Sequence, residues 1–319
     1  MMMNTSKNLC KFPRGTIVKG KWQKQQYTII KELGHGANGV VYLVAAKDGY
    51  AALKMSSNSL SITSEVNVLK SFTKVQGSAL GPSLLDVDDW INQGSQTSFY
   101  VMEYIQGPDL LAFIKIKGGS WIGVLLLQLL ENLEAIHREG WVFGDLKPEN
   151  LLVTGPPYRL RCIDVGGTTR KGRAIKEFTE FFDRGYWNAG SRKAEPSYDL
   201  FSAAMIAVNL ACQRRFDRKE DGLKQVLEVV DQRPELQSFR WVIKKALKGE
   251  YMSASSMRME LMDSLSTSRQ DKQSSKKANK NVQSRQQLYK KKKANALETV
   301  LVVMMVLCFY VFYILFHLV

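Results

Sequence analysis

Apolar residues in the first third of the chain cluster in short runs that are typical of β-strands. The runs at residues 28–33 (TIIKEL) and 40–46 (VVYLVAA) are rich in β-branched and apolar residues. A Lys-Asp-Gly turn at residues 47–49 leads into a third run, YAALKM. Because strands are commonly bounded by such turns, this pattern predicts a small strand-rich lobe from Tyr27 to Tyr104. One helix interrupts it, with an apolar face formed by Val66, Leu69 and Phe72.

After Gly119 the apolar pattern becomes helical. The stretches at residues 122–140 and 198–212 are long and apolar, which predicts helices that pack inside a larger lobe. His137 lies at the end of the first of these helices and is interpreted as a helix-end residue rather than a catalyst. The sequence therefore predicts an α+β fold with two lobes, a small β-rich N-lobe and a large helical C-lobe.

A glycine-rich segment, LGHGANGVVYLV, joins the first two predicted strands. Gly34, Gly36 and Gly39 form the pattern G-x-G-x-x-G, which Val41 follows. Glycines of this spacing let backbone N–H groups fold over phosphates without a side-chain clash. Such a pattern by itself is more often only a turn, but the strands on both sides favour phosphate binding.

Three polar side chains stand at close spacing in VFGDLKPENLLV, at the end of a helical segment. Lys147 follows Asp145 by two positions, and Asn150 follows it by five. Further candidates lie on the elements around this segment. Lys54 stands on the third predicted strand, fifteen residues after Gly39. Two further candidates are Glu65 on the predicted helix and Asp164 in RCIDVGG.

These motifs, in this order, resemble the Hanks-type serine/threonine protein kinases over Tyr27 to Leu265. The resemblance implies transfer of the γ-phosphate of ATP, with Mg²⁺, to serine or threonine of proteins. Asp145 then accepts the proton of the attacking hydroxyl, Lys147 faces the transferring phosphate, and Asn150 binds Mg²⁺.

The same resemblance assigns the other candidates. Lys54 binds the α- and β-phosphates and pairs with Glu65, while Asp164 binds Mg²⁺. In VMEYIQG, adenine is expected to pair with backbone groups of Glu103 and Tyr104. The resemblance implies three further roles. Met102 is the gatekeeper, and the carboxylate of Asp199 holds the backbone of the catalytic loop. Asp109 either contacts the ribose or caps a helix.

The chain departs from the family pattern beside the catalytic aspartate. Phe143 and Gly144 replace the usual His and Arg, and Val165 replaces the Phe of D-F-G. Without that Arg, a phosphate latch on the activation segment is predicted to be absent. The phosphorylatable threonines of the segment, which runs from Asp164 to about Gly190, are Thr168, Thr169 and Thr179.

The usual A-P-E end of the activation segment is not visible. The candidate AEP at residues 194–196 lies too close to Asp199, and Glu250 stands where its Arg partner is expected. Both members of a buried ion pair are therefore predicted to be absent together, since losing one alone strands a charge. Gly144 also suggests a rival class, the small-molecule phosphotransferases, whose catalytic-loop pattern is H-G-D-x-x-x-x-N. The Lys147-Pro148 pair and the complete glycine loop argue against that class. A pseudokinase scaffold is the alternative from another class.

The C-terminal residues 300–319 form an apolar run of twenty residues, with one His near its end. At 1.5 Å per residue such a helix is about 30 Å long, which matches the hydrocarbon core of a bilayer. A single transmembrane helix over residues 299–319 is therefore predicted. No N-terminal apolar segment typical of a secretory signal is present in residues 1–26, which are interpreted as an extension before the kinase domain at residues 27–265.

The chain carries a net charge of +15, and much of it lies before the apolar run. Residues 269–293 hold ten Lys or Arg and one acid, so residues 266–298 are predicted to form a disordered juxtamembrane linker. This charge orients the kinase domain toward the cytoplasm, at the cell membrane. The four cysteines lack metal-binding spacing and indicate buried or lipid-facing thiols in a reducing compartment.

The arrangement of kinase domain, linker and span resembles the YabT-type membrane kinases of spore-forming bacilli. That resemblance implies a response to DNA, and self-association on DNA for phosphorylation in trans. Three roles for the linker remain open: binding anionic lipid, binding DNA without sequence preference, or a passive tether. The basic residues concerned are Lys276, Lys277, Lys280, Arg285, Lys290, Lys291, Lys292 and Lys293.

Overall fold

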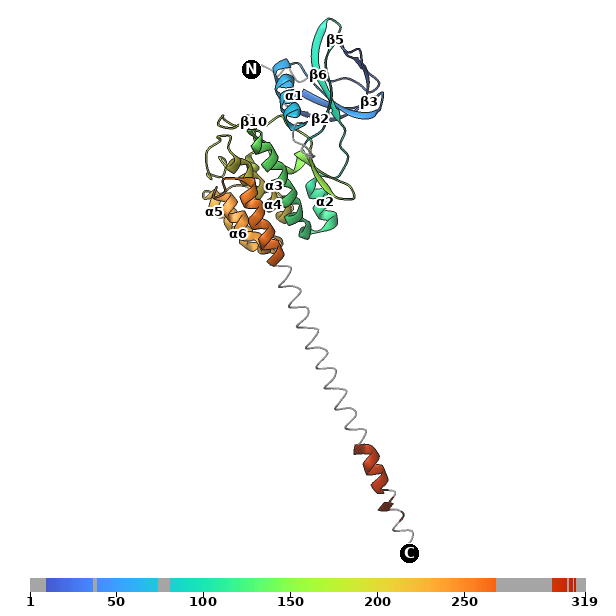
Figure 1. Cartoon of the computed structure of the whole chain (residues 1–319), viewed down its shortest axis with the longest axis vertical. Helices are drawn as coiled ribbons and strands as arrows, with labels where there is room; N and C mark the ends of the chain where they lie inside the picture. Colours follow the sequence, from blue (N-terminus) through green and yellow to red (C-terminus); the bar gives the residue numbers. More distant parts are fainter. Residues whose placement is uncertain are drawn as a thin grey trace. The chain divides into compact units, whose positions relative to one another are not determined.

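The computed structural model describes residues 10–36, 39–73, 81–267, 300–308, 310, 311 and 313. The chain divides into two compact units, residues 1–264 and residues 265–319. The first unit has two lobes, as predicted, with a six-stranded sheet and α1 in one and the remaining helices with four short strands in the other (Figure 1).

The N-lobe is a six-stranded antiparallel sheet in the order β1-β2-β3-β4-β6-β5. Strand β4 is buried over most of its length because α1 packs on it from one side, whereas β3 alternates between buried and half-buried positions in its first half. The core includes Tyr42, Leu53, Met55 and Phe99. The strands are β1 Ile17–Lys19, β2 Gln26–Gly36, β3 Gly39–Ala46, β4 Gly49–Ser56, β5 Leu84–Asn92 and β6 Ser95–Glu103, and the helix is α1 Ser59–Thr73.

Residues 1–26, predicted as an extension before the kinase domain, contain strand β1, which pairs with β2. Beyond it, Lys21 N donates to Asp89 O at 2.7 Å, and Gly20 forms a bridge with Trp90 of β5. The Asp88 carboxylate accepts the backbone N–H groups of Trp22 and Gln23 at 2.7–3.1 Å. These contacts tie the first and last strands of the sheet together.

The C-lobe is built around α4, whose residues from Ser197 to Ala211 are all buried. Helices α3 and α6 pack on it, and a further helix covers residues 254–267. The two predicted apolar helices are thereby confirmed. The helices are α2 Leu110–Lys117, α3 Ile122–Arg138, α4 Pro196–Cys212, α5 Gly222–Gln232 and α6 Arg240–Leu247.

Short strands and 3-10 turns between α3 and α4 carry the polar motifs. The hairpin of β8 and β9 follows the Lys147–Asn150 segment, and β10 pairs with β7. Cys162 in β9 is buried, which raises the pKa of its thiol to about 12 and makes it unreactive at neutral pH. The strands are β7 Trp141–Val142, β8 Leu151–Thr154, β9 Arg159–Cys162 and β10 Thr169–Arg170, and the turns are Gly119–Trp121, Pro148–Asn150, Glu180–Phe182 and Pro234–Phe239.

In the second unit, residues 300–308 are helical. The large side chains from Val300 to Leu307 are 53–63% exposed, and Cys308 is exposed as well. Within the part of the chain that the structure describes, no helix is long and apolar enough to cross a membrane. The predicted basic linker lies almost entirely outside the described residues, as does the end of the predicted span.

Candidate active site

A cavity of about 760 Å³ lies between the two lobes and gathers the predicted motifs. The glycine-rich hairpin, the strand β4 lysine, the catalytic loop and the segment after β9 all contribute to its wall. Of the predicted catalytic, nucleotide-binding and metal-binding residues, Glu65 is not in the lining because it lies buried behind Lys54; Asp109 and Asp199, which had other predicted roles, are also outside it. The predicted residues that line it are Gly34, Gly36, Gly39, Val41, Lys54, Glu103, Tyr104, Asp145, Lys147, Asn150 and Asp164.

The glycine-rich hairpin approaches the neighbouring strand closely at one position. Gly39 has a φ of +132°, and a Cβ atom built there would lie 2.2 Å from Met55 O. No other residue type fits this backbone without displacing β4. This glycine is therefore required by the fold as well as by the phosphate-binding pattern.

Lys54 links the two lobes through a chain of charges. Its Nζ lies 2.7 Å from the Glu65 carboxylate of α1 and 3.5 Å from Asp164 Oδ1. Burial alone would lower the pKa of Lys54, but the carboxylates of Asp164 and Glu65 raise it above its ordinary value. The lysine is therefore charged at neutral pH and held where a phosphate can meet it.

Glu65 has a second donor that the sequence did not indicate. Tyr100 of β6 is buried, and its hydroxyl donates to Glu65 at 2.8 Å. Burial and the charge of Glu65 raise the pKa of Tyr100 well above its ordinary value, so it remains a donor. The two contacts fix α1 on the sheet with its carboxylate toward Lys54.

The catalytic loop presents Asp145 to the cavity with three neighbours. Lys147 Nζ contacts the Asp145 carboxylate, and Thr179 Oγ1 lies 2.8 Å from its other oxygen. Asn150 Nδ2 donates to Asp145 O at 2.9 Å. Sequence reasoning treated Thr179 only as a phosphorylatable residue; its contact with Asp145 and Lys147 arises from the folded activation segment.

The loop backbone is tied down by Asp199, as the resemblance implied. Its buried carboxylate accepts the backbone N–H groups of Phe143 at 2.7 Å and Gly144 at 3.0 Å. His137 Nε2 lies 2.8 Å from the same carboxylate, so this helix-end histidine supports the loop from α3. None of these contacts places His137 at the reacting atoms.

Gly144 stands in a left-handed conformation, with a φ of +83°. A Cβ atom there would approach Gly167 O to 2.7 Å. The residue that replaces the family's arginine is thus the one that this backbone accepts without strain. The absence of an arginine at this position and the tight approach of the catalytic loop to the activation segment therefore belong to the same local structure.

One backbone group of the predicted hinge is used inside the fold. Glu103 N donates to Ser83 O at 2.9 Å, so this N–H is already used inside the fold. The Glu103 carboxylate binds Arg161 at 2.8 and 3.2 Å, and Arg161 also donates to Gly81 O. Tyr104 lines the cavity as expected. The lining also includes residues that the sequence analysis did not select: Ala52, Ile105, Leu152 and Ile163.

Two other assignments are decided by contacts. Asp109 accepts a hydrogen bond from Ala112 N at 2.8 Å and so caps α2, which is the second of its two predicted roles. Met102 is buried next to the cavity and pairs with Ala52 across β4 and β6. This position is consistent with its predicted role as gatekeeper.

Two of the activation-segment threonines are inaccessible. Thr168 is 1% exposed and Thr169 is fully buried, with its Oγ1 donating to Gly167 O at 3.0 Å. Thr169 also lies in β10, opposite Val142 of β7. A kinase cannot reach either hydroxyl while β10 is paired.

The end of the activation segment holds an ion pair that the sequence did not indicate. Glu195, set aside because it lies close to Asp199, forms an ion pair of 2.7 Å with the buried Arg184. Arg184 also donates to Ser191 O and Ser197 Oγ. Glu250 by contrast has a side chain that is 46% exposed, 4.0 Å from Lys248. The buried charge at this place is thus satisfied within the segment rather than by a residue late in the C-lobe.

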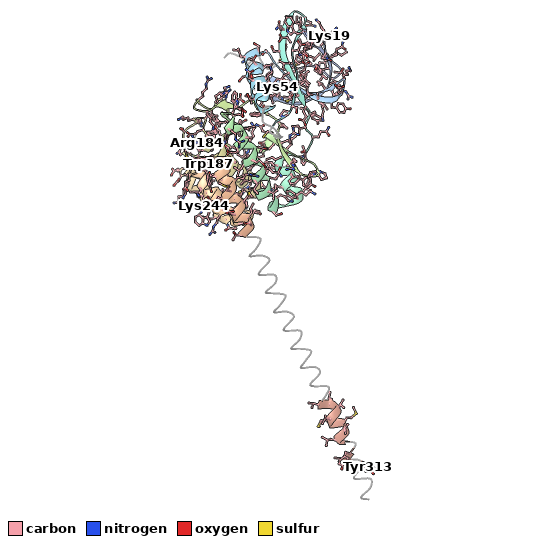
Figure 2. The ribbon with its side chains drawn as sticks, viewed as in Figure 1. Lys19, Lys54, Arg184, Trp187, Lys244 and Tyr313 are labelled. Carbon is pink, nitrogen blue, oxygen red and sulfur yellow. The ribbon has the colours of Figure 1, made fainter. Side chains whose placement is uncertain are left out.

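A second ion pair stabilises the same stretch. The Asp183 carboxylate is completely buried and accepts hydrogen bonds from Arg192 at 2.6 and 2.8 Å and from the Tyr198 hydroxyl at 2.8 Å. Beside it, Trp187 is fully buried and donates to Phe181 O. Figure 2 labels Arg184 and Trp187 in the helical lobe and Lys54 in the strand-rich lobe.

The arrangement is suited to moving a phosphoryl group from a nucleotide. Apolar side chains line the cavity together with the glycines of the hairpin and Lys54, the groups expected to meet the phosphates. Asp145 is positioned to accept the proton of an attacking hydroxyl, with the Lys147 cation beside it.

Two oxygen ligands are available for a metal ion. Asn150 uses its amide N–H on Asp145 O, which leaves its side-chain oxygen, and the Asp164 carboxylate lies at the cavity with its pKa held low by Lys54 despite partial burial. The described residues hold no cluster of three or more His, Cys, Asp or Glu suited to a metal. These two residues therefore fit Mg²⁺ bound partly by nucleotide phosphates, whose charge the ion neutralises when bound.

Comparison with known proteins agrees with this site. Residues 27–288 match the model of the protein kinase domain. Serine/threonine-protein kinase YabT of Bacillus subtilis (strain 168) is 48% identical over 329 aligned positions, covering 97% of each chain. Serine/threonine-protein kinase cds1 of Schizosaccharomyces pombe is 31% identical over 163 positions, which cover 46% of this chain and 34% of cds1.

Among solved structures, vaccinia related kinase 3 has the same fold. It superposes with a TM-score of 0.57 at 18% identity, covering 83% of this chain and 94% of the other. The family match over most of the sequence and the assembled cavity lead to one conclusion: this chain belongs to the protein kinases and is a bacterial Hanks-type serine/threonine kinase similar to YabT, using ATP and Mg²⁺.

Proposed function

We propose that this kinase is held at the cell membrane by residues 299–319, with its catalytic unit facing the cytoplasm, and is stimulated by DNA bound to the basic residues before the span. The observation that carries the proposal is the order of charge and hydropathy along the C-terminal part of the chain. Ten Lys or Arg among residues 269–293 are followed by twenty apolar residues.

The membrane part of the proposal is supported by composition and exposure. The run at residues 300–319 contains no Asp, Glu, Lys or Arg, and its described helical residues expose large apolar side chains. A helix that is apolar on all sides is stable where lipid surrounds it. The cations that precede the run favour the cytoplasmic side.

The proposal that DNA binds here is supported by basic residues in excess of those needed to orient the span. Lys290 to Lys293 suffice to orient the span, whereas Lys276, Lys277, Lys280 and Arg285 lie further from it. Lys and Arg without a recognition motif bind nucleic acid through phosphates, and so without sequence preference. Several chains on one DNA molecule are then close enough to phosphorylate one another in trans.

Two rival functions have less support. A pseudokinase scaffold does not require the Lys54–Glu65 ion pair or the contact of Lys147 with Asp145. Anionic lipid is the rival ligand of the basic segment, since headgroups and nucleic acid both present phosphates. The experiment must therefore separate DNA from lipid.

The test is phosphorylation of a generic protein substrate by the full chain in neutral vesicles, with a titration of duplex DNA. Stimulation is expected to rise and then fall as excess DNA separates the molecules. Replacing Lys276, Lys277, Lys280 and Arg285 by Ala should remove the stimulation; the matched control replaces four exposed lysines of the kinase unit, Lys11, Lys19, Lys31 and Lys47. If anionic vesicles stimulate and DNA does not, the ligand is lipid.

A further inference from the structure

We propose that a cationic ribbon of the activation segment, residues 170–176 with residues 191–194, binds acidic residues of the protein substrate. The enzyme would then prefer a serine or threonine that has Asp or Glu within about five positions of it. This inference rests on the kinase activity and specifies the substrate class for that same site.

The ribbon is a defined piece of structure. Ala174 forms an antiparallel bridge with Lys193. Three backbone hydrogen bonds join the two segments: Gly172 N to Ala194 O, Ala194 N to Arg173 O and Ile175 N to Arg192 O, at 2.7–2.9 Å. Its inner side is apolar, because Ile175 and Ala194 pack with Val142 and Tyr198.

The outer side of the ribbon is strongly cationic. Residues 170–176 contain four Lys or Arg and no acid, and residues 191–194 contain two and no acid. Lys171, Arg173 and Lys193 are exposed, and within the described residues none of their side chains has an ion pair. These three cations are available to a ligand.

The nearby carboxylates do not neutralise this charge. Asp183 is buried against Arg192, and Glu195 is paired with Arg184. Apart from Arg192, five cations remain in the ribbon, and three more acids follow or flank it, Glu139, Glu177 and Glu180. Two of the six cations lie over aromatic rings: Arg170 is 3.9 Å from the centroid of Trp141, and Arg192 is 4.1 Å from that of Phe178.

The ribbon lies within reach of a bound substrate. Lys176 precedes Thr179 by three residues, so their Cα atoms are at most about 11 Å apart. Thr179 Oγ1 in turn lies 2.8 Å from the Asp145 carboxylate, where the substrate hydroxyl must react. An extended peptide advances about 3.3 Å per residue, so side chains three to five positions from the reacting residue reach the ribbon.

The test compares three peptides that share one phosphoacceptor, with Asp, Gln or Lys at the flanking positions. Each exposed ion pair is expected to contribute about twofold to threefold, so three pairs predict about a tenfold higher kcat/KM for the acidic peptide than for the Gln peptide, carried by KM. The preference should weaken in high salt because exposed charges are screened.

The variant K171E/R173E/K193E should remove or reverse this preference, while the Gln peptide is phosphorylated at the wild-type rate. The control K19E/K31E/K47E makes the same change of charge in the strand-rich lobe and should keep the preference; Lys19 is labelled there in Figure 2. If the reversal variant unfolds, K171Q/R173Q/K193Q replaces it, with an expected loss of preference but no reversal.

The proposal is overturned if the wild-type enzyme phosphorylates all three peptides equally well, or if the reversal variant retains the acidic preference. A third result would also overturn it: duplex DNA binds the kinase unit through Lys171, Arg173 and Lys193, and the charge-reversal variant keeps the wild-type peptide preference. The ribbon would then be a nucleic-acid site. The Gln peptide reports the kinase reaction itself, so failure of the substrate proposal is distinct from loss of catalysis.

Discussion

At the scale of single residues, the buried carboxylates of the catalytic unit are each bound by more than one donor. Glu65 receives both Lys54 and Tyr100, and Asp199 receives two backbone N–H groups and His137. An unpaired charge in such a place costs several kcal/mol, so shared donors keep these side chains in one position. The reacting groups are thus placed by neighbours that do no chemistry themselves.

Asp145→Asn removes the proton acceptor, and Lys54→Ala removes the phosphate-binding cation. Each is expected to lower turnover by roughly a hundredfold or more, the scale of a positioned acid–base or electrostatic group. The measurement is phosphate transfer from labelled ATP, with the thermal midpoint as a check on folding. Asp145→Asn with full activity would show that another group accepts the proton.

Thr179 is expected to act as a positioning residue. Its hydroxyl contacts Asp145 and Lys147 together, so Thr179→Val should lower kcat by about tenfold, the scale of one lost hydrogen bond to a charged group. Thr179→Ser keeps the hydroxyl and should retain most of the activity. Equal loss in both variants would mean that the methyl group, and not the hydroxyl, matters.

At the scale of elements, the activation segment is held by its own contacts. Strand β10 pairs with β7, Asp183 binds Arg192, and Arg184 binds Glu195. Protein kinases commonly order this segment with a phosphate gathered by arginines. Here internal ion pairs and buried aromatic rings order it without a phosphate group.

Thr168→Ala combined with Thr169→Ala should therefore leave a substantial part of the basal activity. Both hydroxyls are buried, so their phosphorylation requires β10 to detach from β7. Activity and intact mass of the purified double variant decide this. Complete loss of activity that acidic residues at these positions restore would reveal a phosphate switch, with Arg170 or Lys171 as its cation.

The closure of the N-lobe sheet by Asp88 is expected to depend on pH. Burial would raise the pKa of Asp88, but the backbone N–H groups of Gln23, Trp22 and Asp89 lower it below its ordinary value. A carboxyl whose pKa is lower in the folded state stabilises the fold above its unfolded pKa, about 3.9 for Asp, and loses this effect as pH falls toward the folded value.

Asp88→Asn should accordingly destabilise the protein by about 1–3 kcal/mol at pH 7. The difference from wild type should begin to shrink below about pH 4, where the carboxyl of the unfolded chain becomes protonated, and should shrink further as pH falls toward the lower pKa of the folded state. Thermal unfolding of both proteins at pH 7 and at pH 3.5 measures it. A difference that stays constant with pH would show that the charge of Asp88 is not what closes the sheet.

At the scale of the whole molecule, catalysis and the proposed membrane attachment depend on separate parts of the chain. All the described contacts of the active site lie within the unit of residues 1–264, while the apolar run belongs to the unit of residues 265–319. We therefore expect each function to survive removal of the other part.

Removing residues 299–319 should move the protein from the membrane fraction to the soluble fraction without lowering kcat on a soluble peptide. The physical reason is that the apolar run is expected to supply the lipid contact, whereas the described residues that line the catalytic cavity all lie between Leu33 and Glu177. Fractionation and a peptide assay on the same preparation measure both quantities. The matched control exchanges the run for an unrelated apolar span, which should restore membrane location.

The sequence by itself determined the two lobes, the order of the motifs and most of the catalytic groups. Asp145, Lys147 and Asn150 lie within six residues, so their spacing can be recognised without knowledge of the tertiary structure. The chemistry of phosphoryl transfer demands these residue types, so their presence in family order was sufficient evidence.

Only the tertiary structure decided which groups meet across long distances. It placed Thr179 on Asp145, Glu195 on Arg184 and Tyr100 on Glu65, and it buried Thr168 and Thr169. The left-handed backbone of Gly144 and the pairing of residues 17–19 with the sheet are also visible only in the folded chain. These outcomes depend on packing between segments far apart in the chain, and no local pattern of apolar and polar residues encodes such pairings.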